Sequence, residues 1–445
     1  MTVVVIGGDA AGMSLASRIH RKSPDTEVII FEKSNIVSYG ACGLPFYIGG
    51  INNDINRIMI RKPESFVAEG LDLRVYHEVT AVDPDAKTVT VKNVKTGEVL
   101  IQKYDKLAVC SGSRPIVPPI EGKELKGVYS LRTVPDAERL KEEFSREDVK
   151  RIAIVGGGFI GLELCDAAVE RGKTPLLFEA LPHVMTTYDE DFQTALEAKL
   201  ESNGVELHLG EPLKKINGEG AVKRVVSDKG EFDADLVVFA IGVKPNTEML
   251  PDSHFKKLRN GALVINDSME TGVPDVYAAG DCTTVYNMIT KKQDYIALGS
   301  NANKQGRFAA DVIMGKEVHF DNALGTSIIR VKNFEMGKTG ISEREAIANG
   351  FDYGTCTVTR TSHAPYYVKP EGANLTAKIV YDKKSKVLLG AQIMGEYEAA
   401  MRINIFACAI NCGMTTKELG KLDMAYSPSF TRPWDIVHVV CNAAK

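Results

Sequence analysis

Two glycine-rich turns, each set between apolar runs, constrain this chain more than any other feature. The first turn, at 7–12, reads Gly-Gly-Asp-Ala-Ala-Gly and follows the apolar run 3–6. The second, at 156–161, reads Gly-Gly-Gly-Phe-Ile-Gly and follows the apolar run 152–155. A buried strand, a tight turn that needs glycine and a helix with unpaired N–H groups at its start together form a place for a pyrophosphate. The sequence therefore predicts two βαβ units, each able to bind a dinucleotide.

A glutamate ends the second strand of each predicted unit. Glu32 ends the run 28–32, and Glu179 ends the run 176–179. A carboxylate at this point can accept hydrogen bonds from ribose hydroxyls. The two residues after Glu179 carry no cation for a 2′-phosphate. The second unit therefore favours NADH over NADPH, with the alternative that Glu179 only ends its strand.

Two acidic residues modify this interpretation. Asp9 occupies the middle position of the first motif, where glycine is usual, so that motif alone could also be an ordinary tight turn. Later in the chain, a predicted strand at 276–279 ends in Gly280 and Asp281, which places a carboxylate at the start of the next helix. Asp281 either bonds a polyol hydroxyl or is only a helix N-cap. The two glycine turns favour the first interpretation.

Cys42 lies just past the first unit, in the run 38–45. The nearest other cysteine in sequence is Cys110, so the CxxxxC pair of a dithiol centre is absent. A single redox-active thiol must hold its oxidising equivalent as a sulfenate or as a mixed disulfide with a small thiol. We expect nearby helix dipoles to stabilise the Cys42 thiolate.

The composition excludes several classes of protein. A chain of 445 residues is long enough for about three domains. Its net charge of -4 gives no sign of a nucleic-acid partner, and no apolar stretch of about 18 residues suggests a membrane span. The eight cysteines are scattered without a zinc-like CxxC pair, and no metal constellation appears. A reducing cytoplasm is the expected compartment.

These elements in this order resemble the FAD-dependent pyridine nucleotide–disulfide oxidoreductases over essentially the whole chain. The runs 104–115 and 235–246 look like that family's two crossovers between domains. The resemblance implies an α/β fold with two Rossmann-like dinucleotide-binding domains and a C-terminal α+β dimerisation domain. The implied boundaries are 1–113 and 245–322 for the FAD-binding domain, 114–244 for the NAD-binding domain and 323–445 for the dimerisation domain.

Within that family, the run Gly-Ala-Cys-Gly-Leu-Pro around Cys42 is similar to one single-cysteine branch. The branch holds coenzyme A (CoA) disulfide reductases, NADH oxidases, NADH peroxidases and NADH-dependent persulfide or polysulfide reductases. Peroxidases and many oxidases of the branch carry a histidine in the first glycine turn, and this chain does not. The resemblance therefore implies reduction of CoA disulfide or a related low-molecular-weight disulfide, persulfide or polysulfide. The alternatives are an NADH oxidase and a flavin-bound redox sensor.

The resemblance also implies which residues bind the cofactors FAD and NADH. Glu163 is expected to orient the nicotinamide, or else Lys33 or Lys304. The full expected set is Gly7, Ala10, Ala11, Gly12, Glu32, Lys33, Ser38, Cys42, Val79, Ser111, Gly112, Arg132, Asp281, Ala302, Gly156, Gly158, Phe159, Ile160, Gly161, Glu163, Glu179 and Gly242.

Three tyrosines in the C-terminal third are the expected catalytic partners of Cys42. Tyr366 and Tyr367 stand in a run similar to the His-Ala-x-Tyr-Tyr run of CoA disulfide reductases, and Tyr426 in one similar to their Ala-Tyr-x-Pro segment. A phenol is protonated at neutral pH and can donate its proton to a thiolate leaving group. The resemblance implies a homodimer in which these tyrosines, and Phe430 with them, reach the partner's site. The alternative is that they only pack the dimer interface.

A CoA substrate carries phosphates, so its site should hold cations and small hydroxyl groups. The expected substrate residues are Ser14, Arg18, Arg21, Ser38, Arg61 and Lys62. A solvated helix face is the alternative for the arginines of the first helix. Ala41 and Trp434 depart from residues common in CoA disulfide reductases and leave the acceptor open. Cys408 and Cys412 have apolar neighbours, and we expect both to be buried and inert.

Overall fold

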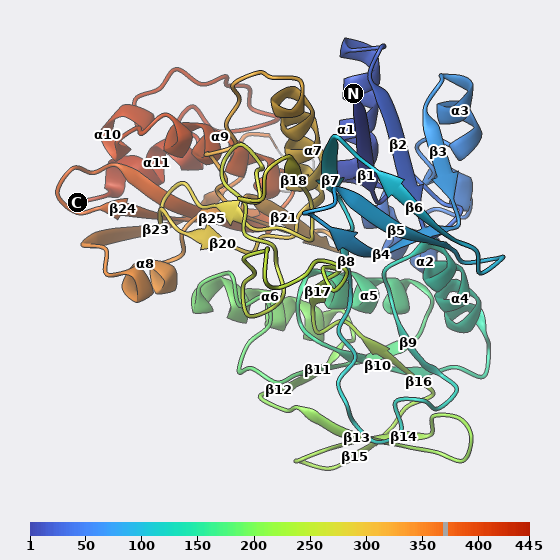
Figure 1. Ribbon diagram of the computed structural model, residues 1–445. Helices are drawn as coiled ribbons and strands as arrows, with labels where there is room; N and C mark the ends of the chain where they lie inside the picture. Colours follow the sequence, from blue (N-terminus) through green and yellow to red (C-terminus); the bar gives the residue numbers. More distant parts are fainter. Residues whose placement is uncertain (368–372) are drawn as a thin grey trace.

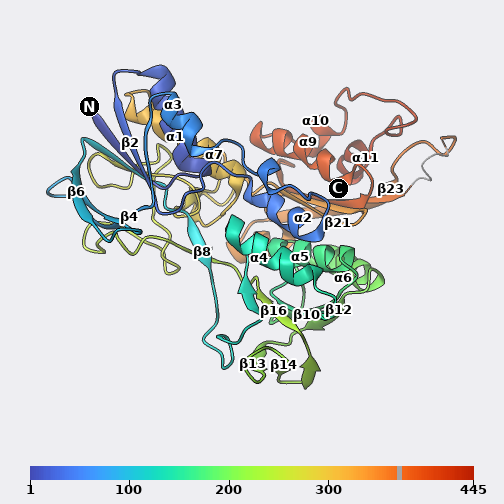
Figure 2. The same ribbon diagram turned by 90° about the vertical axis from the view of Figure 1, so that its right-hand side faces the viewer.

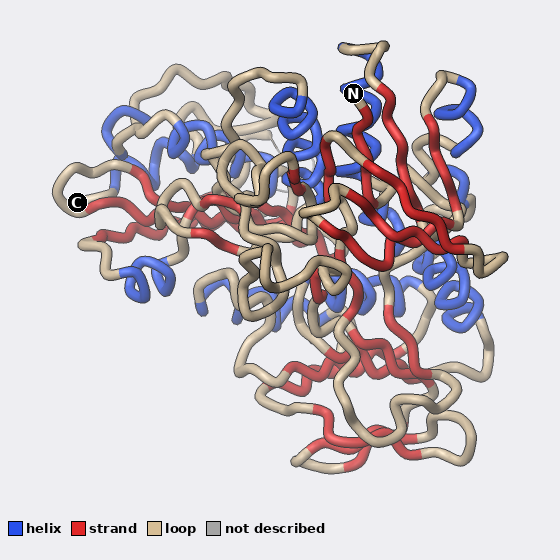
Figure 3. The backbone as a smooth tube through the Cα atoms, in the orientation of Figure 1, coloured by secondary structure: helices blue, strands red, loops and turns tan. Residues whose placement is uncertain are grey.

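The computed structural model of the protein describes residues 1–367 and 373–445, and its chain is arranged in three regions. In Figure 1 the first region, in blue with β18 and α7 in yellow-brown, lies at the upper right, the second, in green, lies below it, and the third, in orange and red, lies at the left. Strands gather into a sheet in each region, and helices lie against the sheets (Figure 3). The predicted α/β fold with a C-terminal α+β domain is confirmed.

The first region is built on a parallel sheet whose strands are ordered β18-β7-β1-β2-β3. The helix that follows the first glycine turn packs closely on α7, because a Cβ at Gly306 would lie 2.2 Å from the Ala11 carbonyl oxygen. An antiparallel sheet, β4-β5-β6, adjoins the first. The elements are β1 (Thr2–Ile6), α1 (Ala10–Lys22), β2 (Glu27–Glu32), α3 (Pro63–Ala68), β3 (Asp72–Val75), β4 (His77–Asp83), β5 (Thr88–Asn93), β6 (Val99–Lys103), β7 (Lys106–Val109), β18 (Val276–Ala278) and α7 (Gly299–Ile313).

The second region repeats this plan with the parallel order β12-β11-β10-β16-β9. The chain enters and leaves it through β8 (Ser113–Pro115) and β17 (Val243–Pro245), which pair with each other next to the predicted domain boundaries. A small antiparallel sheet, β13-β14-β15, completes it. The elements are β9 (Val128–Ser130), α4 (Val134–Ser145), β10 (Arg151–Val155), α5 (Phe159–Glu170), β11 (Thr174–Glu179), α6 (Glu190–Ser202), β12 (Glu206–Leu209), β13 (Leu213–Asn217), β14 (Arg224–Ser227), β15 (Glu231–Asp233) and β16 (Leu236–Phe239).

The third region is an antiparallel sheet, β21-β22-β25-β24-β23, with its main helix, α9, packed on β22 and β25. Two short strands, β19 (Val285–Tyr286) and β20 (Gln293–Asp294), precede it. The elements are β21 (Ser327–Val331), β22 (Phe334–Gly340), α8 (Glu343–Asn349), β23 (Tyr353–Thr361), β24 (Asn374–Asp382), β25 (Leu388–Glu396), α9 (Ala399–Asn411), α10 (Thr416–Leu419) and α11 (Ile436–Ala443). Among the helices of the described ranges, none combines the length and the apolar character that a membrane span needs.

The short segment after the first unit links the first region to the second. It comprises the 3-10 helix η1 (Ala41–Gly43), α2 (Leu44–Gly49) and the 3-10 helix η2 (Ile55–Arg57). Leu44 and Ile48 are buried in the same core as α4 and α5, and the Arg171 guanidinium donates to the Ile48 carbonyl at 2.9 Å. Figure 2 shows α2 lying above α5. The segment that carries Cys42 is therefore fixed against the second nucleotide unit.

Candidate functional site

The first glycine turn admits no side chain at its key positions. Gly7 has φ +102°, and a Cβ there would lie 2.3 Å from the Cys110 carbonyl oxygen. A Cβ at Gly12 would lie 1.9 Å from the Gly7 carbonyl oxygen, so α1 could not approach the turn. The Gly8 N–H donates to Glu32 Oε2 at 2.9 Å. Glu32, at the end of β2, thus holds the turn in place. The first N–H groups of α1 point into the space outside the turn.

The second turn has the same construction. Gly156 has φ +113°, and a Cβ at Gly161 would lie 1.9 Å from the Gly156 carbonyl oxygen. The Gly157 N–H donates to Glu179 Oε2 at 2.7 Å. A Cβ at Gly158 would meet no protein atom within 4 Å, so this corner is open for a ligand.

Both turns fit a dinucleotide by the chemistry of their donors. Neither α1 nor α5 carries an acidic residue in its first turn. Each glutamate also uses its other oxygen locally: the Oε1 atoms of Glu32 and Glu179 accept from the N–H groups of Ser34 at 2.8 Å and Leu181 at 2.9 Å. A carboxylate offers about four acceptor positions, so both can still meet ribose hydroxyls. The predicted FAD and NADH sites therefore fit the residues present.

Asp281 lies in a turn after β18, and the helix predicted to begin at this carboxylate is not there, because α7 starts only at Gly299. The prediction of a helix start was wrong; the glycine at 280 has φ +88° and turns the chain away from a helical path. Asp281 instead forms an ion pair with Arg132 at 2.9 Å, and both side chains are largely buried. This pair places two predicted cofactor residues together.

Cys42 is exposed and lies in the 3-10 helix before α2. Partial burial of the side chain raises the pKa of the thiol. The nearby carboxylates of Glu163 and Asp281 raise it further, and the Arg132 guanidinium opposes them. The expectation of a stabilised thiolate was therefore wrong for the protein alone, because two negative charges and desolvation outweigh the helix ends.

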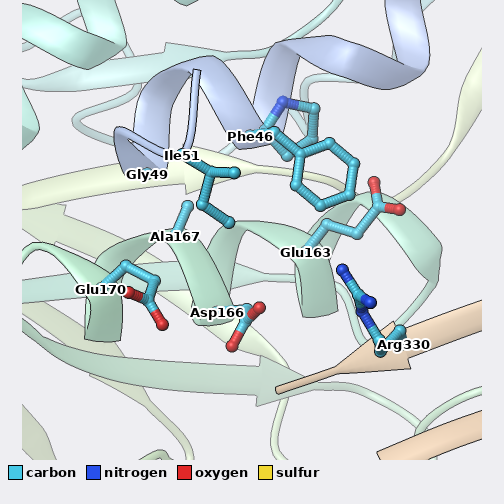
Figure 4. Close-up of a pocket in the computed structure, with 9 residues that line it drawn as sticks. Phe46, Gly49, Ile51, Glu163, Asp166, Ala167, Glu170 and Arg330 are labelled. Atoms are coloured by element: carbon cyan, nitrogen blue, oxygen red, sulfur yellow. The ribbon is translucent and has the colours of Figure 1, made fainter. Parts of the chain in front are cut away.

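Glu163, on α5, has its pKa raised to about 7 by burial and by the charge of Asp166. Figure 4 shows both carboxylates beside Arg330 in a small pocket under Phe46 and Ile51. That pocket has room for about one water molecule. Across 1–367 and 373–445, no ion pair joins Glu163 to either lysine with which it was predicted to interact; both Lys33 and Lys304 are exposed.

The predicted catalytic tyrosines lie at an exposed edge of the third region. The hydroxyl groups of Tyr366 and Tyr426 are hydrogen-bonded to each other, although sixty positions separate them. Tyr366 is 68% exposed and Tyr426 is 43% exposed, and the shared bond raises the pKa of Tyr426. Tyr367 packs edge-on against His363 with ring centroids 5.5 Å apart. In the described part of the chain, no hydrogen bond joins these tyrosines to Cys42.

The predicted substrate residues do not share one environment. Arg18 pairs with Asp311 of α7 at 2.5 Å, and Arg61 pairs with Glu69 at 2.6 Å while lying over the Phe66 ring. Ser38 has φ +48° and donates its N–H to the Gly8 carbonyl at 3.0 Å. Ser14 is half-buried, and Arg21 and Lys62 are exposed. Arg21 and Lys62 are the two predicted substrate cations that are exposed, and the role of the whole set in binding stays a prediction.

The other predicted cofactor residues lie at strand ends, at the starts of the two helices or in the crossovers. Ser111 donates its hydroxyl to the Asn246 carbonyl at 2.5 Å. Gly112 and Gly242 both have positive φ, at +64° and +112°. Ala302 is buried in α7, Val79 is buried in β4, Ala10 and Ala11 open α1, and Phe159 and Ile160 open α5. Their roles in binding stay predictions.

Sequence reasoning missed two features and misjudged a third. Asp9 accepts a hydrogen bond from the Tyr39 N–H at 3.2 Å and so contacts the segment before Cys42; its departure from glycine was the available signal. Asp189, buried at the start of α6, contacts Lys378 of the third region at 3.1 Å, with no sequence signal. Cys408 and Cys412 were predicted to be buried and are exposed, because their turn of α9 faces away from the sheet.

Comparison with known protein families divides the chain in two. Residues 1–306 match the model of the pyridine nucleotide-disulphide oxidoreductases. Residues 326–436 match the model of the dimerisation domain of the same proteins.

Comparison with individual proteins covers the whole chain. A protein of Pyrococcus horikoshii described as an NAD(P)H coenzyme A polysulfide/persulfide reductase is 36% identical over 445 residues, covering 100% of this chain and 98% of that protein. An Enterococcus faecalis NADH oxidase is 33% identical over 447 residues, covering 100% of this chain and 99% of that protein. The solved structure of an NAD-dependent persulfide reductase from A. fulgidus has a TM-score of 0.95 at 33% identity, covering 99% of this chain and 82% of that one.

Proposed function

Because this chain belongs to the pyridine nucleotide-disulphide oxidoreductase family, we propose that it uses NADH and FAD to reduce a CoA-linked disulfide, persulfide or polysulfide through Cys42. One observation carries this proposal: an exposed, unpaired thiol on a segment fixed between two dinucleotide turns. None of the eight cysteines forms a disulfide, so no second thiol is paired with Cys42. The acceptor must therefore bond to this one sulfur.

Cys42 begins the reaction as the nucleophile. Its thiolate attacks one sulfur of the acceptor, so that a new bond joins Cys42 to that sulfur and the other sulfur leaves as a thiolate. The raised pKa of the thiol keeps most of it protonated at neutral pH, so a proton must leave before attack. Glu163, whose pKa is about 7, is the nearby group able to hold such a proton. The chemistry that bound FAD supplies is the passage of electrons from NADH to the mixed disulfide.

The hydrogen-bonded Tyr366–Tyr426 pair is suited to protonate the leaving thiolate. One phenol donates its proton, and the other stabilises the resulting phenolate through their shared bond. The pair is exposed and belongs to the region that matches a dimerisation domain. We infer that it serves Cys42 of the partner subunit in a homodimer. Arg21 and Lys62 are the exposed cations that would meet the phosphates of a CoA acceptor.

A second candidate function is NADH oxidase activity, which a relative at 33% identity carries in its name. In that case Cys42 would pass through a sulfenate, and no thiol substrate would be needed. Free cysteines throughout the chain suit a cytoplasmic location in either case.

Steady-state rates with CoA disulfide, CoA persulfide, polysulfide, peroxide and oxygen separate these functions. We expect the CoA-linked acceptors or polysulfide to be reduced fastest, and Cys42→Ser to abolish those rates. Oxygen turnover that survives Cys42→Ser, while every thiol acceptor stays inert in the natural enzyme, would contradict the reductase proposal. The mass of the Cys42 peptide identifies the acceptor independently, because a CoA adduct, one oxygen and one sulfur differ in mass.

A further inference from the structure

Asp9 stands at the N-terminal end of α1, where the second unit has Gly158. It occupies the N-cap position, yet its side chain makes no capping bond to the helix. Its Oδ1 atom instead accepts from the Tyr39 N–H at 3.2 Å. The carboxyl therefore contacts the segment that leads to Cys42, and the Ala10 N–H at the start of α1 lies close enough to lower the pKa of Asp9.

The charged groups around Asp9 do little to neutralise the negative charge of its carboxylate. Arg132 is the cation that faces it, but that guanidinium is already paired with Asp281 at 2.9 Å. Glu32 adds a second negative charge from the end of β2, and the Tyr39 phenol is neutral. Burial is the strongest influence and raises the pKa of Asp9 to about 6. In the protein alone, Asp9 therefore changes its charge close to neutral pH.

A pyrophosphate at this helix end would make the ionised form still less favourable. It brings negative charge beside the carboxyl and displaces water, and both effects disfavour a carboxylate. A neutral carboxylic acid avoids the repulsion and gains an O–H donor. It also keeps its second oxygen as the acceptor for the Tyr39 N–H. The protonated residue can thus satisfy its protein contact while a phosphate group lies nearby.

We propose that Asp9 takes up one proton when FAD binds, so that flavin retention weakens as the pH rises. The direction follows from linkage, because a group that binds protons more tightly in the complex favours the complex at low pH. Binding is strongest below the pKa of Asp9 in the flavin-free protein and weakens as the pH rises from there toward its pKa in the complex. The second unit has no carboxyl at this position, so NADH binding there has no matching proton uptake.

Flavin release from the holoenzyme tests this directly. The purified protein is diluted at a series of pH values, and the free FAD is measured by the recovery of its fluorescence. We expect the apparent dissociation constant to rise by up to about tenfold per pH unit between about pH 6 and pH 8, the slope of one proton. Asp9→Asn keeps an oxygen for the Tyr39 N–H and cannot ionise, so its dissociation constant should be independent of pH over this range.

Two further variants serve as controls. One distinguishes the charge of Asp9 from its hydrogen bond to the Tyr39 N–H, and the other tests for general effects of pH. Asp9→Ala is also uncharged but loses the acceptor, so it should release FAD more readily than Asp9→Asn at every pH, with the same flat profile. Asp228→Asn, an exposed position between β14 and β15, should keep the natural pH slope.

A natural enzyme with no pH slope, or an Asp9→Asn variant that keeps the slope, would overturn the proposal. Loss of flavin from Asp9→Asn at all pH values would do the same, since the neutral isostere should bind. The absence of a slope in the natural enzyme overturns the proposal even if a variant fails to fold. Because the readout is flavin release, the outcome does not depend on which acceptor Cys42 reduces.

Discussion

The two glycine turns have the same backbone construction, and the similarity extends along the chain beyond Glu32 and Glu179, which contact them. Ser38 donates its N–H to the Gly8 carbonyl at 3.0 Å, and Met185 donates to the Gly157 carbonyl at 2.8 Å. Both residues have φ +48°, in the left-handed region. The chain thus returns to each turn in the same conformation after different loops.

Four residues beyond this shared contact, the two units differ. The first places Cys42 there, as an exposed thiol. The second places Asp189 there, buried and bonded to Gln392 and Lys378 of the third region. The same position therefore holds an exposed thiol in the first unit, whereas in the second unit it holds a carboxylate that bonds to the third region. This difference gives each unit its own expected response to mutation.

The largest expected effect is on catalysis in the first unit. Cys42→Ser should lower turnover of thiol acceptors by about a thousandfold or more, because the hydroxyl cannot replace the sulfur nucleophile. Flavin content and NADH binding should be unchanged. Rates with CoA disulfide and polysulfide measure this, and Cys408→Ser, at another exposed thiol, is the matched control. A Cys42→Ser enzyme with substantial thiol-acceptor turnover would contradict the proposed role.

Substitution at the equivalent position of the second unit, Asp189, should lower the stability of the protein. Asp189→Ala leaves Lys378, which is 9% exposed, without its most buried partner. We expect a loss of about 3 kcal/mol in the free energy of unfolding. Denaturant unfolding measures it, and the alkylation rate of Cys42 in the folded protein should stay the same. An Asp189→Ala variant as stable as the natural protein would show that this ionic group is dispensable.

An alanine substitution in each glycine turn should impair the binding of one cofactor and leave the other bound. Gly161→Ala puts a Cβ 1.9 Å from a carbonyl oxygen and should raise the KM for NADH by tenfold or more, about 1.4 kcal/mol. FAD should remain bound in this variant. Gly12→Ala creates the same clash in the first unit and should yield protein poor in flavin. Absorbance of bound flavin and NADH kinetics distinguish the two, and loss of flavin from both would argue against independent sites.

The glutamates should differ in their effect on nicotinamide choice. Glu179→Gln removes the charge that disfavours a 2′-phosphate and should reduce the preference for NADH over NADPH by about tenfold. Glu32→Gln should leave that preference unaltered, because it lies in the other unit. The ratio of kcat/KM for the two nucleotides is the measurement. A natural enzyme that prefers NADPH would contradict the use of Glu179 as a selector.

The smallest expected effect concerns the Cys42 thiol. Its pKa is raised, so alkylation by iodoacetamide should still be accelerating at a pH where an ordinary thiol reaches its plateau. Glu163→Gln removes a negative charge and should lower that pKa, which speeds alkylation near neutral pH by about two- to fivefold. Cys408 alkylation serves as the internal reference. A slower reaction of Cys42 in the variant would reverse the assigned electrostatic role of Glu163.

Much of the fold could be predicted from local pattern. Gly7 and Gly156 have positive φ, and a Cβ at Gly12 or Gly161 would clash with the carbonyl oxygen five residues earlier, so the spacing of these glycines predicts strand, turn and helix. Solvent exposure was harder to predict, because Cys408 lies in α9 among buried residues and Cys412 caps the end of that helix, and only the rotation of α9 on its sheet decides which face is covered. The partners of Arg18 and Asp281 were not predicted, because they lie far away in the chain.

The sequence by itself determined that two dinucleotide units are present and that one unpaired thiol follows the first. Only the tertiary structure decided the chemical state of that thiol. Its pKa depends on desolvation and on Glu163, Asp281 and Arg132, which reach Cys42 from three separate segments. Electrostatic interactions act through space and depend on burial, so the spacing of residues along a chain does not contain them. For the same reason, the sequence marks Asp9 as unusual, and the fold shows which charges surround it.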